Sequence, residues 1–180
     1  EGPGYWEYGL GYAARFAWHL RHASGGKIDL FRHPFLRHTG DFRFYMHTHG
    51  DEVWNWSDGR KRAGPSLTLA ILARVHRNPA WQQMVLRQGI EHLAHLYYVD
   101  PELRAAIPAN LPPIRHFPGP GVVVARSGFD DADTFVGIKA ADIPHYNHHC
   151  HLDAGHLVIH AAGRELLAES EHWVYPREGS

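Results

Sequence analysis

The apolar residues near the N-terminus recur with the period of an α-helix. Tyr8, Tyr12, Phe16 and Leu20 are each four positions apart, which predicts one apolar stripe along a helix. The segment Ser24-Gly25-Gly26 then ends the helix, because glycine is a common stop signal. We expect Tyr8, which begins the stripe, to be a core residue.

Three helices joined by short links are predicted from residue 65 onwards. Pro65 opens an apolar stretch, and Asn78-Pro79 then supplies an N-cap followed by a proline at the first helical position. Apolar residues continue at roughly helical spacing from Trp81 to Tyr97, and Asp100-Pro101 repeats the start signal. Short links between successive helices favour antiparallel neighbours.

The segment 27–63 has no clear period, and we expect it to be irregular with one short strand or helix. Trp54 and Trp56 lie just before Asp58-Gly59, which is a turn signal. An exposed aromatic pair beside a turn would suit a carbohydrate groove, and packing at the surface is the alternative. The following Arg60-Lys61-Arg62 is the only compact basic cluster, and we interpret it as a solvated loop.

Prolines mark a change of character between residues 107 and 120. This segment holds five of the 12 prolines, which predicts a boundary between one domain at 1–110 and another at 117–180. Beyond the boundary the pattern turns to strands, and the fold class is therefore α+β. The runs that predict an antiparallel meander of about four strands are 122–124, 134–138, 156–160 and 165–169.

Composition narrows the classes of function. The 180 residues carry a formal net charge of −1, which argues against a surface for nucleic acid. No apolar run is long enough to cross a bilayer, and the single cysteine, Cys150, excludes an internal disulfide. The chain begins at Glu1 without an initiator methionine and ends in a short, unpaired sheet, so we expect it to be part of a longer protein.

The densest group of chemically active residues lies at 145–153, in a chain with 17 histidines. His149, His151 and Asp153 alternate there, so an extended segment would point all three side chains to one side. Imidazole nitrogen and carboxylate oxygen are ligands that suit zinc, and a solvated polar loop is the alternative. The same alternation puts Cys150 on the opposite side, where we expect a buried, unreactive thiol.

A second candidate is the N-terminal motif at residues 1–9, Glu-Gly-Pro-Gly-Tyr-Trp-Glu-Tyr-Gly. Its Gly-Pro-Gly turn would present Tyr5 and Trp6 at the beginning of the first helix. Aromatic faces at this place could stack on sugar rings. The alternative is that Trp6 is a core residue of that helix, as we expect for Tyr8.

The segment 147–155, Asn-His-His-Cys-His-Leu-Asp-Ala-Gly, together with the following strand, Gly163 and Glu169, resembles the start of the heparinase II/III-like domain. The N-terminal motif is similar to one near the end of the helical toroid in that family of polysaccharide lyases. Residues 117–140 and 40–59 are similar as well, so the resemblance covers essentially the whole chain. It implies the C-terminal helices of an (α/α) toroid followed by the first strands of an antiparallel β-sandwich.

The resemblance also implies roles for individual residues. Tyr5 matches the catalytic tyrosine, and His149 matches a histidine that acts in catalysis or neutralises charge, with His148 as the alternative. His151 and Glu169 match ligands of a structural zinc ion, although the family usually has aspartate at the second of these positions, and one further ligand would follow Ser180. The residues expected to contact the substrate are Trp6, Glu1, Trp56, Asn147 and His148.

The implied activity is β-elimination at a uronic acid in a polysaccharide or oligosaccharide, for example alginate or heparan sulfate. It predicts a periplasmic or secreted lyase that binds an acidic glycan, with a homodimer as a candidate assembly and without nucleic acid or a membrane span. Two other classes of function stay open. A zinc-dependent glycan hydrolase would activate water through His149, His151 and Asp153. A non-catalytic carbohydrate-binding fragment would use Trp6, Trp54 and Trp56.

Overall fold

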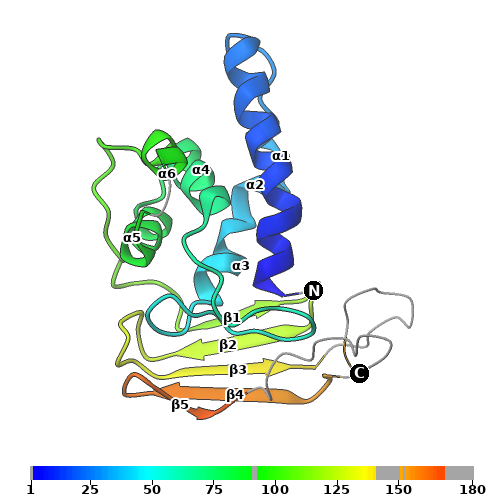
Figure 1. Ribbon diagram of the computed structural model, residues 1–180, viewed down its shortest axis with the longest axis vertical. Helices are drawn as coiled ribbons and strands as arrows, with labels where there is room; N and C mark the ends of the chain where they lie inside the picture. The colour runs from blue at the N-terminus through cyan, green and yellow to red at the C-terminus, as the bar shows by residue number, and fades with distance from the viewer. Residues whose placement is uncertain (1, 91–92, 141–150, 152, 169–180) are drawn as a thin grey trace, which may run out of the picture.

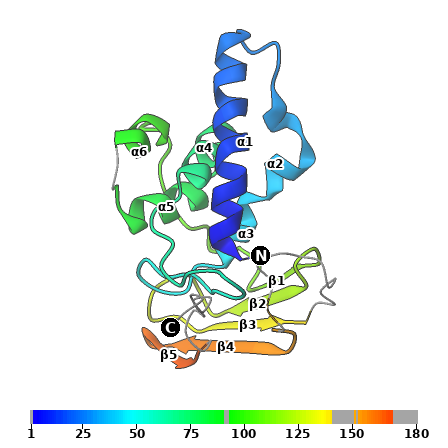
Figure 2. The same ribbon diagram turned by 45° about the vertical axis from the view of Figure 1, so that its right-hand side comes forward.

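The structure is a computed structural model that describes residues 2–90, 93–140, 151 and 153–168 (Figure 1). A group of helices stands on a single antiparallel sheet, and the N-terminal end of the longest helix, α1, points towards that sheet (Figures 1 and 2). The mixed α+β class is therefore confirmed. The helical elements are α1 (Pro3–Ala23), η1 (Leu30–Arg32), α2 (Pro34–His38), α3 (Gly40–Tyr45), α4 (Leu67–His76), α5 (Pro79–Gln88) and α6 (Leu93–Tyr98).

The predicted meander is confirmed and is extended by one strand. The described strands pair in the order β1-β2-β3-β4-β5, each antiparallel to its neighbour. The additional strand, β1, lies between the prolines of the predicted boundary, where the sequence pattern indicated a linker. The strands are β1 (Ile114–Phe117), β2 (Val122–Arg126), β3 (Phe135–Lys139), β4 (His156–Ala161) and β5 (Arg164–Leu167).

The first helix is confirmed, but the prediction of its buried face was wrong. Tyr8, Tyr12 and Phe16 are 67%, 61% and 63% exposed. The buried face includes the small residues Gly11, Ala14 and Ala17 instead. Small side chains let α1 approach α4 closely: a Cβ atom on Gly11 would lie 3.3 Å from the hydroxyl oxygen of Thr68. Close backbone approach, rather than aromatic bulk, therefore decides which face of α1 packs.

Helix α5 begins at the predicted Asn78 cap, whereas the cap of α4 is Ser66, which the sequence pattern did not indicate. The helix start predicted at Asp100-Pro101 was wrong: the chain forms a turn there, in which the Asp100 side chain accepts the amide of Glu102 at 3.0 Å. The Ser66 hydroxyl accepts the backbone N–H of Leu69 at 2.9 Å, and the Asn78 side chain accepts the N–H groups at the start of α5. The apolar pattern that runs to Tyr97 is divided between α5 and α6, because Gly89 follows α5 with φ of 93°. Residues 27–63 contain three short helices, η1, α2 and α3, so this segment is more helical than expected.

Trp54 and Trp56 are core residues, so the expected exposed aromatic pair was wrong. They are 1% and 0% exposed. The Trp54 ring packs edge-on against Phe135 of β3, with the ring centres 6.1 Å apart. A Cβ atom on Gly137 of the same strand would lie 2.7 to 2.9 Å from atoms of the Trp54 indole. Only glycine at this position lets the indole rest on the sheet.

One cluster of buried side chains joins the helices to the sheet. It includes Ile71 and Leu72 from α4 as well as Val122, Val124 and Phe135 from the sheet. The boundary predicted between residues 110 and 117 remains a prediction.

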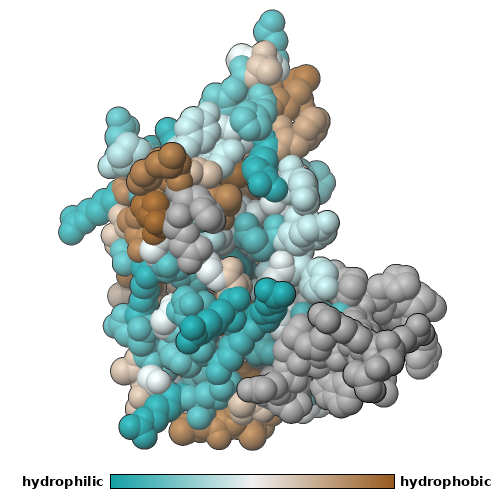
Figure 3. All heavy atoms as spheres, in the orientation of Figure 1, coloured by the Kyte–Doolittle hydropathy of each residue, from teal (hydrophilic) through white to brown (hydrophobic). Residues whose placement is uncertain are grey.

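Apolar residues also remain at the surface. On the face seen in Figure 3 they gather over α6 and along the edge strand β5, where Leu93 and Leu166 are exposed. Within the described residues, no helix combines the length and the apolar character needed to cross a membrane.

The buried side chain of His47 predicts sensitivity to acid. Burial lowers the pKa of His47 from 6.5 to about 4, and its Nε2 atom lies 2.8 Å from the carbonyl oxygen of Gly50. The unfolded chain therefore takes up this proton at a higher pH than the folded chain. We expect the free energy of unfolding to fall by up to about 3 kcal/mol as the pH drops from 6.5 towards 4.

Urea unfolding at a series of pH values measures this effect. His47→Gln keeps an amide donor for Gly50 but cannot titrate, so its stability should fall less over the same range. The exposed His116 provides the control, because His116→Ala should keep the wild-type pH dependence. A His47→Gln profile as steep as that of the wild type would contradict the assignment.

Candidate functional site

The candidate site is built on the turn that follows Trp56. The amide of Gly59 donates to the carbonyl of Trp56 at 3.0 Å, and a Cβ atom on Gly59 would lie 2.9 Å from that same oxygen. Ser57 adopts a left-handed conformation with φ of 54°. The buried indole of Trp56 thus fixes a tight turn, and the turn presents Ser57 and Asp58 to the rest of the chain.

The turn binds the segment that carries the predicted histidines. The amide and the hydroxyl of Ser57 both lie 3.1 Å from Oδ2 of Asp153. The other oxygen, Oδ1, lies 2.5 Å from Nζ of Lys139 in β3, and these two side chains are only 4% and 6% exposed. Asp153 is therefore one half of a buried ion pair that anchors the segment. Its two oxygens already accept three hydrogen bonds, which disfavours the interpretation of Asp153 as a zinc ligand.

His151 is oriented by a carboxylate from the same turn. Its Nε2 atom lies 2.7 Å from Oδ1 of Asp58, whose side chain is almost buried. The His151 side chain is about one-third exposed, so its ring remains partly accessible. A nearby carboxylate fixes the orientation of an imidazole ring. The sequence pattern indicated only a turn at Asp58 and did not predict this role.

Zinc chemistry suits His151 in part. An imidazole nitrogen is a common zinc ligand, and the predicted partner Glu169 lies outside the described residues. Among the residues that the structure describes, no group of three or more histidine, cysteine, aspartate or glutamate side chains is arranged to hold a metal ion.

Tyr5 lies at the junction of two grooves beside the first turn of α1. The first groove has a volume of about 470 Å³ and also contains Asp58, the partner of His151. The second, of about 580 Å³, contains Trp6, whose indole Nε1 donates to the hydroxyl of Thr39 at 2.8 Å. The first groove is lined by Gly4, Tyr5, Glu7, Tyr8, Asp58, Gly59, Arg60, Arg62 and Ala63.

Glu7 holds this first turn in place, a role that the sequence pattern did not reveal. Its Oε1 accepts the amide and the hydroxyl of Thr68 at 3.1 and 2.8 Å, and its Oε2 accepts the hydroxyl of Ser66. Glu7 therefore caps the N-terminus of α4 from a neighbouring helix. Arg43 is fully buried nearby, where burial lowers its pKa to about 10 and the charge of Glu7 opposes that shift.

A second cluster ties the same loop to the edge of the sheet. Nζ of Lys61 lies 3.3 Å from Oε2 of Glu52 and pairs with Glu165 of β5. Nδ1 of His49 lies 3.3 Å from Nδ1 of His160 in β4. The Nε2 atoms of these histidines lie 3.3 Å from Glu52 and 3.5 Å from Glu165 respectively. The loop is therefore attached to the sheet on both sides of the turn.

The remaining predicted site residues have different outcomes. Trp56 is fully buried, and its indole packs against Phe42 with ring centres 6.0 Å apart. Its ring is therefore not available to stack on a sugar. The other predicted positions lie outside the described residues, and their roles stay predictions: Glu1, Asn147, His148, His149 and Glu169.

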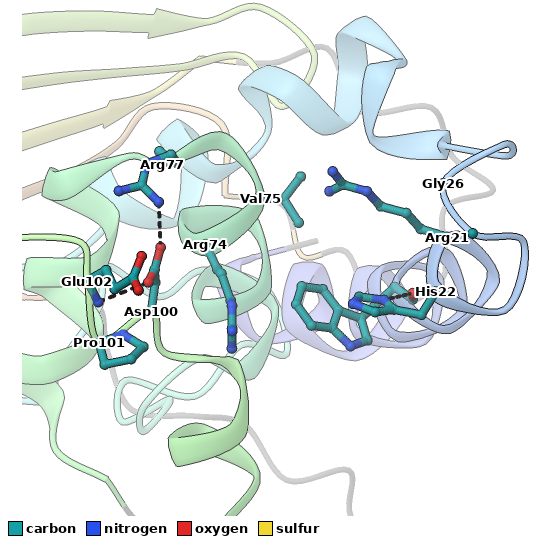
Figure 4. Close-up of a pocket in the computed structure, with 11 residues that line it drawn as sticks. Arg21, His22, Gly26, Arg74, Val75, Arg77, Asp100, Pro101 and Glu102 are labelled. Carbon is teal, nitrogen blue, oxygen red and sulfur yellow. Dashed lines mark hydrogen bonds and ion pairs between the residues drawn. The ribbon is translucent and has the colours of Figure 1, made fainter.

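Another cavity lies between α1 and α4, with a volume of about 660 Å³ (Figure 4). Its basic side chains already have partners. Arg77 pairs with Asp100 at 3.1 Å, and Arg74 donates to the carbonyl of Tyr97 at 2.7 Å. None of the predicted site residues lines this cavity, so the grooves at Tyr5 are the stronger candidate.

Breaking the buried ion pair should destabilise the fold. Asp153→Asn leaves the Lys139 ammonium buried without its counter-charge, and we expect a loss of about 3–5 kcal/mol in the free energy of unfolding. Lys139→Met should cost a similar amount. The double variant Lys139→Met with Asp153→Asn should lose less than the two single variants added together. Urea unfolding of the four proteins measures this difference, and strict additivity would contradict a direct interaction.

Comparison with known proteins adds no relative from which a function could be transferred. No model of a known protein family matches the chain, and no curated protein matches it. The functional argument therefore depends on the residues of the site itself: a tyrosine in a groove, a histidine held by a carboxylate, and the charged side chains around them.

Proposed function

We propose that the chain is part of a polysaccharide lyase that cleaves a uronic-acid-containing polysaccharide or oligosaccharide by β-elimination. The observation that carries the proposal is the groove that Tyr5 shares with Asp58, the carboxylate that holds His151 at 2.7 Å. Arg60 and Arg62 line the same groove and supply positive charge. The resemblance of the chain to the heparinase II/III-like lyases supports the same conclusion.

The reaction needs a base, an acid and a cation. The hydrogen on C5 of a uronate is weakly acidic because it lies next to the carboxylate, and positive charge near that carboxylate stabilises the anion that forms. A base removes the proton, the electron pair forms the C4=C5 double bond, and the C4–O bond breaks. An acid then protonates the departing glycosidic oxygen. The products are a new unsaturated end and a new free hydroxyl.

Tyr5 is the proposed acid, or both acid and base, and His149 is the proposed base or charge neutraliser. A phenol has an ordinary pKa of about 10, and nearby cations favour its ionised form. His149 is two positions before His151. The contacts of Asp58 with His151, and of Ser57 and Lys139 with Asp153, therefore fix the segment that follows it.

Zinc has a structural part in the proposal. His151 and Glu169 would hold the ion, which would cross-link the histidine segment to the end of the sheet. Each of the steps above uses side chains of this chain alone.

Replacement of His151 tests the zinc proposal without an activity assay. We expect His151→Ala to lower both the bound zinc per chain and the melting temperature, because one ligand and the contact with Asp58 are lost together. Elemental analysis and thermal unfolding provide the two readings. His116→Ala removes an exposed histidine of β1 and should change neither. Zinc retained in full by His151→Ala would remove His151 from the ligand set.

The other classes of function predict different products. A glycan hydrolase would release reducing ends without a double bond, and a carbohydrate-binding fragment would bind without turnover. The burial of Trp54 and Trp56 weakens the second alternative, because it leaves Trp6 alone of the three expected aromatic contacts. A periplasmic or secreted location and a homodimer are proposed from the family resemblance alone.

An ultraviolet assay on acidic polysaccharides tests the activity. The complete protein that contains this chain should raise the absorbance of unsaturated uronate with one polymer of a panel that includes alginate and heparan sulfate. Tyr5→Phe should lower the rate by about 100-fold or more, because it removes the proton-transferring hydroxyl. Tyr12→Phe changes an exposed tyrosine of the same helix that does not line either groove, and it should keep the wild-type rate.

Two results would contradict the proposal. Reducing ends without new absorbance would identify a hydrolase. A Tyr5→Phe variant as fast as the wild type would exclude Tyr5 from the chemistry, provided that circular dichroism shows the same fold for both proteins.

A further inference from the structure

The basic segment Arg60-Lys61-Arg62 follows the turn, and its three side chains have different surroundings. The amide of Val53 donates to the carbonyl of Lys61 at 2.8 Å, and Glu52 forms an antiparallel bridge with Arg62. Arg60 and Arg62 line the groove at Tyr5, whereas Lys61 is not among the residues that line it. The groove therefore receives two of the three basic side chains, and Lys61 lies outside it.

The side chain of Lys61 lies between two acidic side chains. Its ammonium group lies within ion-pair distance of both Glu52 and Glu165. Together with His49 and His160, these residues form the cluster that attaches the loop to β4 and β5. Lys61 is thus a structural cation, and its charge is compensated inside the protein.

Arg60 and Arg62 line the groove at Tyr5. Within the described part of the chain no carboxylate forms an ion pair with Arg60, which is exposed. The Arg62 side chain is 75% exposed, and its Nε atom lies 3.8 and 3.9 Å from Asp51 and Glu52, beyond hydrogen-bond distance. Both guanidinium groups retain donors that an incoming ligand can use.

The two carboxylates that line the same groove are occupied. Glu7 accepts hydrogen bonds from Ser66 and Thr68, and Asp58 lies against His151. Their remaining capacity to pair with the arginines is therefore small. The groove combines two accessible cations with acidic groups that already have partners, and this balance favours an anionic ligand.

We propose that Arg60 and Arg62 bind the carboxylate of a uronate sugar beside Tyr5, and that they make the groove selective for acidic over neutral glycans. This inference rests on the proposed function and names the residues that set its substrate class. A guanidinium group matches a carboxylate with two parallel hydrogen bonds, which an ammonium group cannot form. The expected solvated loop agrees with the exposure of Arg60 and Arg62, whereas Lys61 belongs to the ion cluster.

Equilibrium binding tests the inference separately from turnover. Isothermal titration calorimetry would compare an oligouronate with the same oligosaccharide after its carboxyl groups are reduced to alcohols. The complete protein carrying Tyr5→Phe is the host, so that the ligand is not cleaved. We expect Arg60→Gln with Arg62→Gln to weaken binding of the oligouronate by about tenfold or more. Binding of the reduced ligand should not change.

Two matched variants separate a specific contact from a general effect of charge. Arg164→Gln removes an exposed guanidinium of β5 outside the groove and should leave both affinities unchanged. Arg60→Lys keeps the charge but loses the paired hydrogen bonds. Its affinity for the oligouronate should therefore lie between that of the host protein and that of the double glutamine variant. Equal losses for Arg164→Gln and for the groove variants, or no loss for the latter, would overturn the inference. So would a host protein that binds the reduced ligand as tightly as the oligouronate.

Failure of the proposed function gives a different result. If the wild-type protein binds the oligouronate through Arg60 and Arg62 but never forms an unsaturated end, the lyase proposal fails and the anion site stands. If unsaturated ends form at an unchanged KM and kcat in the double variant, the lyase stands and the role of the two arginines fails.

Discussion

The contact between the indole of Trp54 and the backbone of Gly137 determines where the candidate site can form. The loop from residue 46 to residue 62 crosses the sheet at this point, and a side chain on Gly137 would occupy the space of the indole. With Trp54 in place, Trp56 packs beside it with ring centres 4.9 Å apart, and the turn that follows is fixed. The positions of Ser57, Asp58 and the basic segment all depend on this one packing contact.

Two carboxylates near the groove hold neighbouring elements of the fold together. Asp153 neutralises Lys139 beside the turn at Ser57, and Glu7 caps α4 beside the first turn of α1. Each carboxylate also has a cation near it: Lys139 beside Asp153, and the buried Arg43, whose pKa responds to the charge of Glu7. Both groups therefore hold elements together, while Arg60 and Arg62 remain exposed at the groove.

Local signals in the sequence predicted the elements better than their packing. The cap at Asn78, the helical spacing of apolar residues and the β-branched runs identify the longer helices and most strands, because those signals act within a few residues. The buried face of α1 could not be chosen in this way, since an aromatic stripe and a stripe of small residues share the same period. The strand β1 was hidden by its flanking prolines. The motif around Tyr5 placed that residue at a helix start, but the partners of Asp58 and Asp153 come from distant segments and needed the fold.

The alternation of Arg60, Lys61 and Arg62 makes the length of this loop as important as its charges. Because Lys61 pairs with Glu52 and Glu165 while Arg60 and Arg62 line the groove, the loss or gain of one residue between Gly59 and Arg60 would exchange their surroundings. A lysine would then enter the groove, and an arginine would face Glu52 and Glu165 at the edge of the sheet. A substitution at Arg60 or at Lys61 would alter either the groove or the attachment of the loop, whereas a shift of register would alter both together.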